Sequence, residues 1–142
     1  MNNLTKFRIA RPAHELFEAF ADPAKIGNFW FSSSSERWEK GKSVTLIYKE
    51  YNAEVGITLL EVEADKRIVF QWAGEENIVT ITLEEQPDES TIIAINEEGF
   101  QENDPELLGK IVDNKEGWVF VLSCLKGYLE FGVTALRTGI VK

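Results

Sequence analysis

The chain has 142 residues, and its 24 acidic side chains outnumber the 15 Lys and Arg side chains, so its formal net charge is −9 at pH 7. This length suits one domain that buries its own apolar core. A net negative charge without a basic stripe repels phosphate backbones and anionic lipid. We therefore expect neither nucleic acid nor membrane among the partners of this protein.

The cysteine count and the absence of targeting signals bear on the compartment. Cys124 is the only cysteine, so no disulfide can form within the chain, which fits a reducing compartment. The amino terminus lacks the apolar segment of a secretory signal, and no apolar run reaches the length of a membrane span. These features predict a soluble, cytoplasmic protein.

The first third of the chain predicts a strand followed by two short helices. Residues 4–10 alternate polar and apolar side chains, which indicates a strand. Pro12 suits the first turn of a helix, which ends at Asp22-Pro23. Asp22 can in turn cap a second short helix that runs toward residues 29–31.

From residue 37 the apolar side chains recur at every second position, which predicts strands. One of these segments places Val55, Ile57 and Leu59 on one face, with Thr58, Leu60 and Val62 on the other. Turns at residues 74–76 and 86–89 separate the later strands. Because the strands are sequential and closely joined, we expect an antiparallel meander.

The last third predicts one long amphipathic helix. Asp104-Pro105 can begin a short helix that is interrupted near Asp113-Asn114, before the long helix runs to a cap at Gly132. Ser123, Lys126 and Glu130 mark the expected solvent face. The apolar face is formed by the stripe Trp118, Leu122, Leu125 and Leu129, widened by Val121, Cys124, Tyr128 and Phe131. This arc is wider than one buried contact needs, so the helix is expected to touch a second surface, such as the first helices, a pocket rim or another subunit.

The order of these elements resembles the bacterial proteins related to the carboxy-terminal domain of the activator of Hsp90 ATPase. The resemblance covers nearly the whole chain and is sharpest at residues 9–20, at Asp22-Pro23 and in the helix that opens with Gly117-Trp118. Those proteins belong to the START-like, or Bet v 1-like, helix-grip superfamily. Many relatives carry a polar residue or His just before the Glu-Gly that ends the last strand, whereas this chain has Glu97.

The resemblance implies an α+β helix-grip fold. In that fold a curved antiparallel sheet of about six to seven strands wraps around a long carboxy-terminal helix, and two short helices follow the first strand. Residues 1–132 would form this single domain, with residues 133–142 as a tail. The implied cavity between sheet and helix predicts binding of a hydrophobic or amphipathic small molecule. Its expected wall consists of Trp30, Tyr48, Phe70, Trp72, Trp118 and Leu122.

Other functions remain open at this point. Some members of the superfamily are cyclases or hydrolases, and Tyr48 and Glu97 would be the residues to use in such chemistry. The Hsp90 activator suggests a protein-binding, co-chaperone-like module, and the wide apolar arc suggests a homodimer. The sequence favours a binding protein over an enzyme, because it contains no recognised catalytic motif.

The remaining polar candidates have simpler interpretations. His14, the only histidine, falls in the first turn of a helix and is expected to be solvated, while Cys124 is expected to be a small buried apolar residue. The glutamates lie mainly on strands and turns, as solvated edge charges do. With one His and one Cys there is no zinc spacing, and no phosphate loop is present, so we expect no metal, no cofactor and no catalytic residue.

Overall fold

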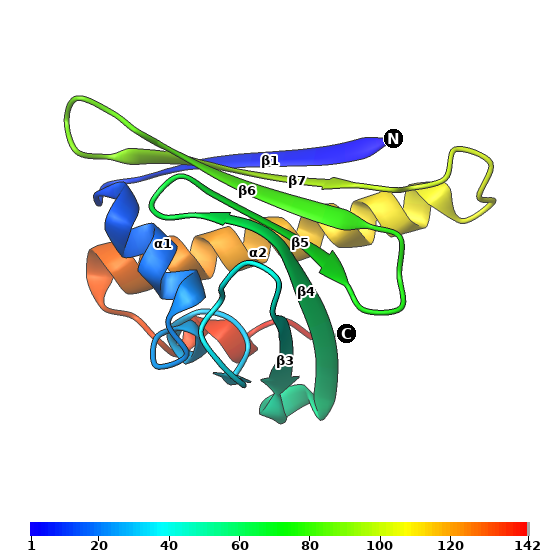
Figure 1. Cartoon of the computed structure of the whole chain (residues 1–142), viewed down its shortest axis with the longest axis horizontal. Helices are drawn as coiled ribbons and strands as arrows, with labels where there is room; N and C mark the ends of the chain where they lie inside the picture. Colours follow the sequence, from blue (N-terminus) through cyan, green and yellow to red (C-terminus); the bar gives the residue numbers. More distant parts are fainter. Residues whose placement is uncertain (142) are drawn as a thin grey trace.

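Seven antiparallel strands form one sheet in the order β1-β7-β6-β5-β4-β3-β2, and one long helix, α2, lies along its inner face (Figure 1). This computed structural model describes residues 1–141. The strands are β1 (Asn2–Ile9), β2 (Ser33–Ser34), β3 (Ser43–Tyr48), β4 (Ala53–Glu63), β5 (Arg67–Trp72), β6 (Ile78–Glu85) and β7 (Thr91–Glu98). The helices are α1 (Ala13–Ala21) and α2 (Leu107–Phe131), and single 3₁₀ turns are η1 (Ile26–Asn28), η2 (Lys49–Tyr51) and η3 (Leu136–Thr138). The predicted helix-grip architecture is therefore confirmed.

The alternation of side chains along the strands builds the core. Register places Ile57 opposite Trp72, Phe70 opposite Val79, and Ile81 opposite Ile95, so that one face of the sheet is almost wholly apolar. That face packs on α2, whose Leu122 and Leu125 are fully buried, and on the apolar side of α1. The core is thus a single layer between the sheet and the helices.

The pairing of β4 with β5 contains an irregularity that the period-two pattern missed. Register shifts between Leu59 and Glu61, which leaves Leu60 as an extra residue, 39% exposed. After this bulge Val62 returns to the core side, where it packs on the buried cluster instead of lying on the opposite face as expected. Bulges increase local bending, so this one contributes to the curvature of the sheet.

Two helix predictions need correction. The second short helix expected after Asp22-Pro23 is only the 3₁₀ turn η1, although the Asp22 carboxylate does accept a hydrogen bond from the Ala24 amide at 2.9 Å. The expected interruption near Asp113-Asn114 does not occur, because α2 runs without a break through these residues. Asn114 is fixed there by Asn3 of β1, whose Nδ2 donates to its Oδ1 and to the carbonyl of Ile111.

Most of the wide apolar arc of α2 is buried within the chain itself. Val121 and Cys124 are buried, and Tyr128 stacks on Phe29 with ring planes 3° apart. Phe131, by contrast, is 72% exposed. The expected solvent face also makes contacts: Lys126 Nζ donates to the carbonyl of Arg8 at 2.8 Å and pairs with Glu130. The surfaces that α2 contacts besides the sheet face therefore include the segment that follows α1, through Phe29.

The end of the chain packs against β3 and η2 even though its sequence carries no firm signal. After Gly132, which adopts a left-handed conformation (φ 68°), the chain turns back along the molecule (Figure 1). Arg137 in η3 is buried, and Tyr51 donates to the carbonyl of Ile140 at 2.7 Å. Within residues 1–141, neither helix combines the length and apolar character that crossing a bilayer requires.

Candidate functional site

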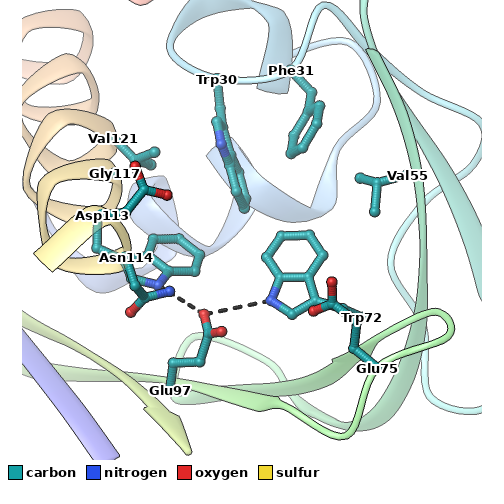
Figure 2. Close-up of a pocket in the computed structure, with 11 residues that line it drawn as sticks. Trp30, Phe31, Val55, Trp72, Glu75, Glu97, Asp113, Asn114, Gly117 and Val121 are labelled. Carbon is teal, nitrogen blue, oxygen red and sulfur yellow. Dashed lines mark hydrogen bonds between the residues drawn. The ribbon is translucent and has the colours of Figure 1, made fainter. Parts of the chain in front are cut away.

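An open pocket of about 370 Å³ lies between the inner face of the sheet and the middle of α2. Strands β4, β5 and β7 provide its floor, α2 forms one wall, and the segment after η1 reaches over it from the opposite side (Figure 2). Its lining residues are Trp30, Phe31, Val55, Trp72, Glu75, Glu97, Asp113, Asn114, Gly117, Trp118 and Val121. Clefts of this volume with largely apolar walls are typical of small-molecule sites.

Three tryptophans from three different elements meet in this pocket. The ring centroids of Trp30 and Trp118 are 5.3 Å apart, and Trp72 lies 6.4 Å from each of them. Trp30 also contacts Phe31, with centroids 4.8 Å apart. Such aromatic groups offer a large apolar contact area with little loss of side-chain entropy, which suits the binding of a flat or apolar body.

Glu97 is the polar centre of the site. It follows the inward-facing positions of β7, opposite Val79 and Asn3, and only 4% of its surface is exposed. Trp118 Nε1 donates to its Oε1 at 3.0 Å, Trp72 Nε1 lies 3.4 Å from the same oxygen, and Asn77 Nδ2 donates to its Oε2 at 2.9 Å. Figure 2 shows the carboxylate pointing from the sheet toward the indoles, with Trp30 and Phe31 on the far side. Glu97 thus orients two of the three tryptophans.

A second, more polar hollow of about 560 Å³ adjoins the pocket and shares Glu75, Glu97, Asp113 and Asn114 with it. Lys110 is the one basic residue that lines it, and its ammonium group forms a salt bridge with Asp104 at 2.5 Å. The hydrogen bond from Lys110 lowers the pKa of Asp104, and the same bond raises the pKa of Lys110. Because Lys110 is the one basic residue among five acidic ones in this hollow, the approach to the aromatic pocket is acidic.

The structure brings together half of the predicted ligand-binding residues. Trp30, Trp72 and Trp118 line the pocket. Phe70 and Leu122 do not reach it, since both are fully buried in the core beneath it. Tyr48 is also absent from its lining: its hydroxyl donates to the carbonyl of Arg137, and burial raises its pKa to about 12.

The residues that sequence reasoning missed are those that long-range pairing brings in. Phe31 and Val55 were read only as members of local patterns, and Asn114 as a point of interruption, yet all three line the pocket. Glu97 was named only as an enzyme candidate together with Tyr48, but the hydrogen bonds of the two groups lead to different partners. Glu97 continues the alternation of Ile93 and Ile95, and this pattern could have indicated that its side chain points into the core.

Arg137 forms a second polar cluster that supports the pocket from behind. Its Nε donates to the carbonyl of Trp30 at 2.6 Å, and its terminal nitrogens bind the Glu50 carboxylate at 2.8 and 3.0 Å and the Ser32 hydroxyl at 2.9 Å. The guanidinium also lies 4.9 Å from the centroid of the Tyr48 ring. Hydrogen bonds from Arg137 and then Ser32 lower the pKa of Glu50 to about 2. This cluster fixes the backbone that carries Trp30.

The two remaining candidates occupy the places expected of them. His14 is exposed, and its Nδ1 lies 2.9 Å from an Asp65 oxygen at the surface. Cys124 is buried, and burial raises the pKa of its thiol, so it is not a reactive thiolate. In the part of the chain that the structure describes, no three His, Cys, Asp or Glu side chains are grouped so that they could hold a metal ion.

A family comparison decides the affiliation of the chain. Residues 10–130 match the model of the activator of Hsp90 ATPase homolog 1-like proteins. The chain belongs to this family. No curated protein matches it. The matched range includes α1, strands β2 to β7, nearly all of α2 and every residue that lines the pocket, and it begins just after β1.

Solved structures agree with this assignment. Protein SSP2350 of Staphylococcus saprophyticus is 46% identical, with 94% of this chain and 95% of that chain covered and a TM-score of 0.85. The Aha1 dimer of Colwellia psychrerythraea is 15% identical, covers 93% and 98% of the two chains, and gives a TM-score of 0.80. DynU16, from the dynemicin biosynthetic locus, is 22% identical with a TM-score of 0.83, over 96% of this chain and 49% of that one. The last two, at these identities, show the fold alone.

Proposed function

We propose that the protein binds a hydrophobic or amphipathic small molecule in the pocket between the sheet and α2. The observation that carries this proposal is the wall of Trp30, Trp72, Trp118 and Phe31 around a volume of about 370 Å³. Trp30, Phe31 and Trp118 are 6%, 8% and 4% exposed and Trp72 is half-buried, so the aromatic surface still open to the pocket is a small part of each ring. An apolar body placed there would remove this remaining aromatic surface from water.

Gly117 offers a direct test of this site. It lines the pocket from α2, and a Cβ added to it would meet no atom within 4 Å, so a side chain at this position starts in open space beside the pocket. Gly109 lies on the same helix, also without atoms within 4 Å, but outside the pocket lining. The variants Gly117→Leu and Gly109→Leu therefore differ in whether the new side chain enters the pocket.

The experiment measures binding of the neutral probe naphthylethanol by calorimetry and by thermal shift. We expect the wild type and Gly109→Leu to bind alike, and Gly117→Leu to lose most of the binding. At a probe concentration of a hundred dissociation constants, binding stabilises the fold by about 2.7 kcal/mol, which a thermal shift can detect. Loss of binding in both variants, or in neither, would contradict the assignment to this pocket.

The partners proposed from the sequence include a second copy of the chain. Leu108, Val112 and Val119 form an exposed apolar stripe on the outer side of α2, with exposed fractions of 77%, 56% and 38%. The Colwellia protein is a dimer in its solution structure. Light scattering after size exclusion separates the cases: twice the chain mass of 16.1 kDa supports a dimer, and Val112→Glu should then restore the monomer. A mass of 16.1 kDa for the wild type removes the dimer.

The protein-binding alternative rests on the Hsp90 activator for which the family is named. No contact of the pocket argues for that alternative. The cytoplasmic location likewise remains a prediction, which cell fractionation can check.

A further inference from the structure

We propose that the ligand of this pocket is an organic cation: an aromatic or aliphatic body that carries an ammonium group. This inference rests on the proposed small-molecule site and adds the charge of its ligand. It comes from how Glu97 is buried and from which side chains surround it.

The Glu97 carboxylate is held by neutral groups only. All three of its hydrogen-bond partners, Trp72, Trp118 and Asn77, donate an N–H to it, so both oxygens act as acceptors, which is the role of a carboxylate. The salt bridges among residues 1–141 join other groups, and Glu97 takes part in none of them. A buried charge is normally paired with an opposite charge. Glu97 has no such partner in the salt bridges of residues 1–141, and its side chain lines the pocket.

The other charged residues that line the pocket are also acidic. Glu75 and Asp113 also line it, and no Lys, Arg or His is among the lining residues. In the adjoining hollow the Lys110 ammonium is bound to Asp104. An anionic ligand such as a fatty acid or a phosphate would meet carboxylates on several sides of the pocket, whereas a cation would be attracted from the solvent inward.

The aromatic wall suits a cation as well as an apolar body. The faces of indole rings attract cations, and Trp does so more strongly than Tyr or Phe. Trp72 and Trp118 lie beside the Glu97 carboxylate and Trp30 packs against both, so one ligand can place its body against the rings and its ammonium group near the charge. A metal ion fits less well, because the described residues contain no group of three metal-binding side chains.

The test compares three probes with the same ring system: naphthylethylamine, naphthylethanol and naphthylacetate. We expect the amine to bind the wild type about tenfold more tightly than the alcohol, which corresponds to about 1.4 kcal/mol, and the acetate to bind most weakly. Raising the salt concentration should weaken binding of the amine and leave that of the alcohol nearly unchanged.

Two isosteric variants then locate the effect. Glu97→Gln removes the buried charge, and its amide can still accept from the two indoles. Glu98→Gln removes the same charge from the neighbouring residue, which is exposed and does not line the pocket. We expect Glu97→Gln to abolish most of the preference for the amine while the alcohol still binds, and Glu98→Gln to keep that preference.

Each outcome bears on the proposal. If the wild type binds the alcohol as tightly as the amine, the cation inference is wrong although the small-molecule site stands. If none of the three probes binds, both proposals fail. If Glu98→Gln reduces the preference as much as Glu97→Gln does, the net charge of the protein is responsible and the assignment to Glu97 is overturned. The comparison of probes on the wild type holds even if Glu97→Gln does not fold.

Discussion

Glu97 and Arg137 are the two buried charged side chains among residues 1–141, and they are accommodated in different ways. Arg137 has an ionic partner in Glu50 and binds the carbonyl of Trp30 as well. Glu97 has only neutral donors. The first arrangement is complete within the chain and therefore structural, whereas the second leaves a charge that a ligand can satisfy.

Replacing Arg137 by Met keeps an extended side chain but removes the guanidinium hydrogen bonds. The carbonyl of Trp30 then lacks its donor, and we expect the free energy of unfolding to fall by about 1–3 kcal/mol, measured by urea denaturation. Arg67→Met is the control, because Arg67 and Glu61 are 43% and 45% exposed and such pairs contribute about 0–1 kcal/mol. Equal losses in the two variants would show that Arg137 acts only as a surface pair does.

The ion pair of Arg137 also predicts a dependence of stability on pH. The folded pKa of Glu50 is about 2, below its ordinary value of 4.5, so the carboxylate contributes stability above pH 4.5 and loses it as the pH falls toward 2. We expect the difference in free energy of unfolding between the wild type and Glu50→Gln to be constant near neutral pH and to close over that acid range. In an Arg137→Met background the closure should become smaller, because the hydrogen bond from Ser32 remains while the larger one from Arg137 is lost. A difference that stays constant down to pH 2 would contradict the assignment.

At the scale of elements, local patterns predicted what local interactions determine. Alternation located the long strands of the sheet, and the wide apolar stripe located the helix that the sheet surrounds. Trp72 and Trp118 could be placed at the pocket because each lies on the inward side of a predicted element. The bulge at Leu60 was not predictable, since it changes the period of the strand without any turn residue.

Contacts between distant segments account for the other differences. Asp113, Asn114 and Gly117 are poor helix formers, so an interruption was a reasonable expectation. The hydrogen bond that Asn114 accepts from Asn3, 111 residues away, holds the helix there. Arg137 pairs with Glu50 across 87 residues, and no periodicity records such a pair. For the same reason Tyr48 was expected in the pocket, although its hydroxyl donates a hydrogen bond to the carbonyl of Arg137 near the end of the chain.

The glycines of α2 allow a prediction about this helix. Gly117 is in the helix interior and has open space at its Cβ position, so Gly117→Ala should raise the free energy of unfolding by about 0.8–1.0 kcal/mol through helix propensity. Gly109→Ala should give a smaller gain, because Gly109 lies in the first turn. Urea denaturation of the two single variants and the double variant checks both values and their additivity. A loss of stability in Gly117→Ala would mean that the helix needs glycine at that position.

At the scale of the whole molecule, the surplus of acidic residues affects stability in two opposing ways. The net charge of −9 causes long-range repulsion that destabilises the compact state. Ion pairs on the surface, such as Lys42 with Glu36 and Glu39 at 3.1 and 2.6 Å, oppose it over short distances. Salt screens long distances more effectively than contacts, so the two effects can be separated by ionic strength.

We expect the thermal midpoint to rise when the salt concentration increases. The screening length falls from about 30 Å at ~0.01 M to about 8 Å at ~0.15 M, so repulsion across a molecule of this size is largely removed while paired groups in contact still interact. A gain of about 1 kcal/mol would raise the midpoint by a few degrees for a chain of this length. Sodium and potassium chloride should give the same rise, since screening does not depend on which cation is used. A midpoint that falls with salt would show that the exposed ion pairs stabilise the fold by more than the repulsion destabilises it. The pair of Lys110 with Asp104 near the pocket would then be one of the contacts that salt weakens.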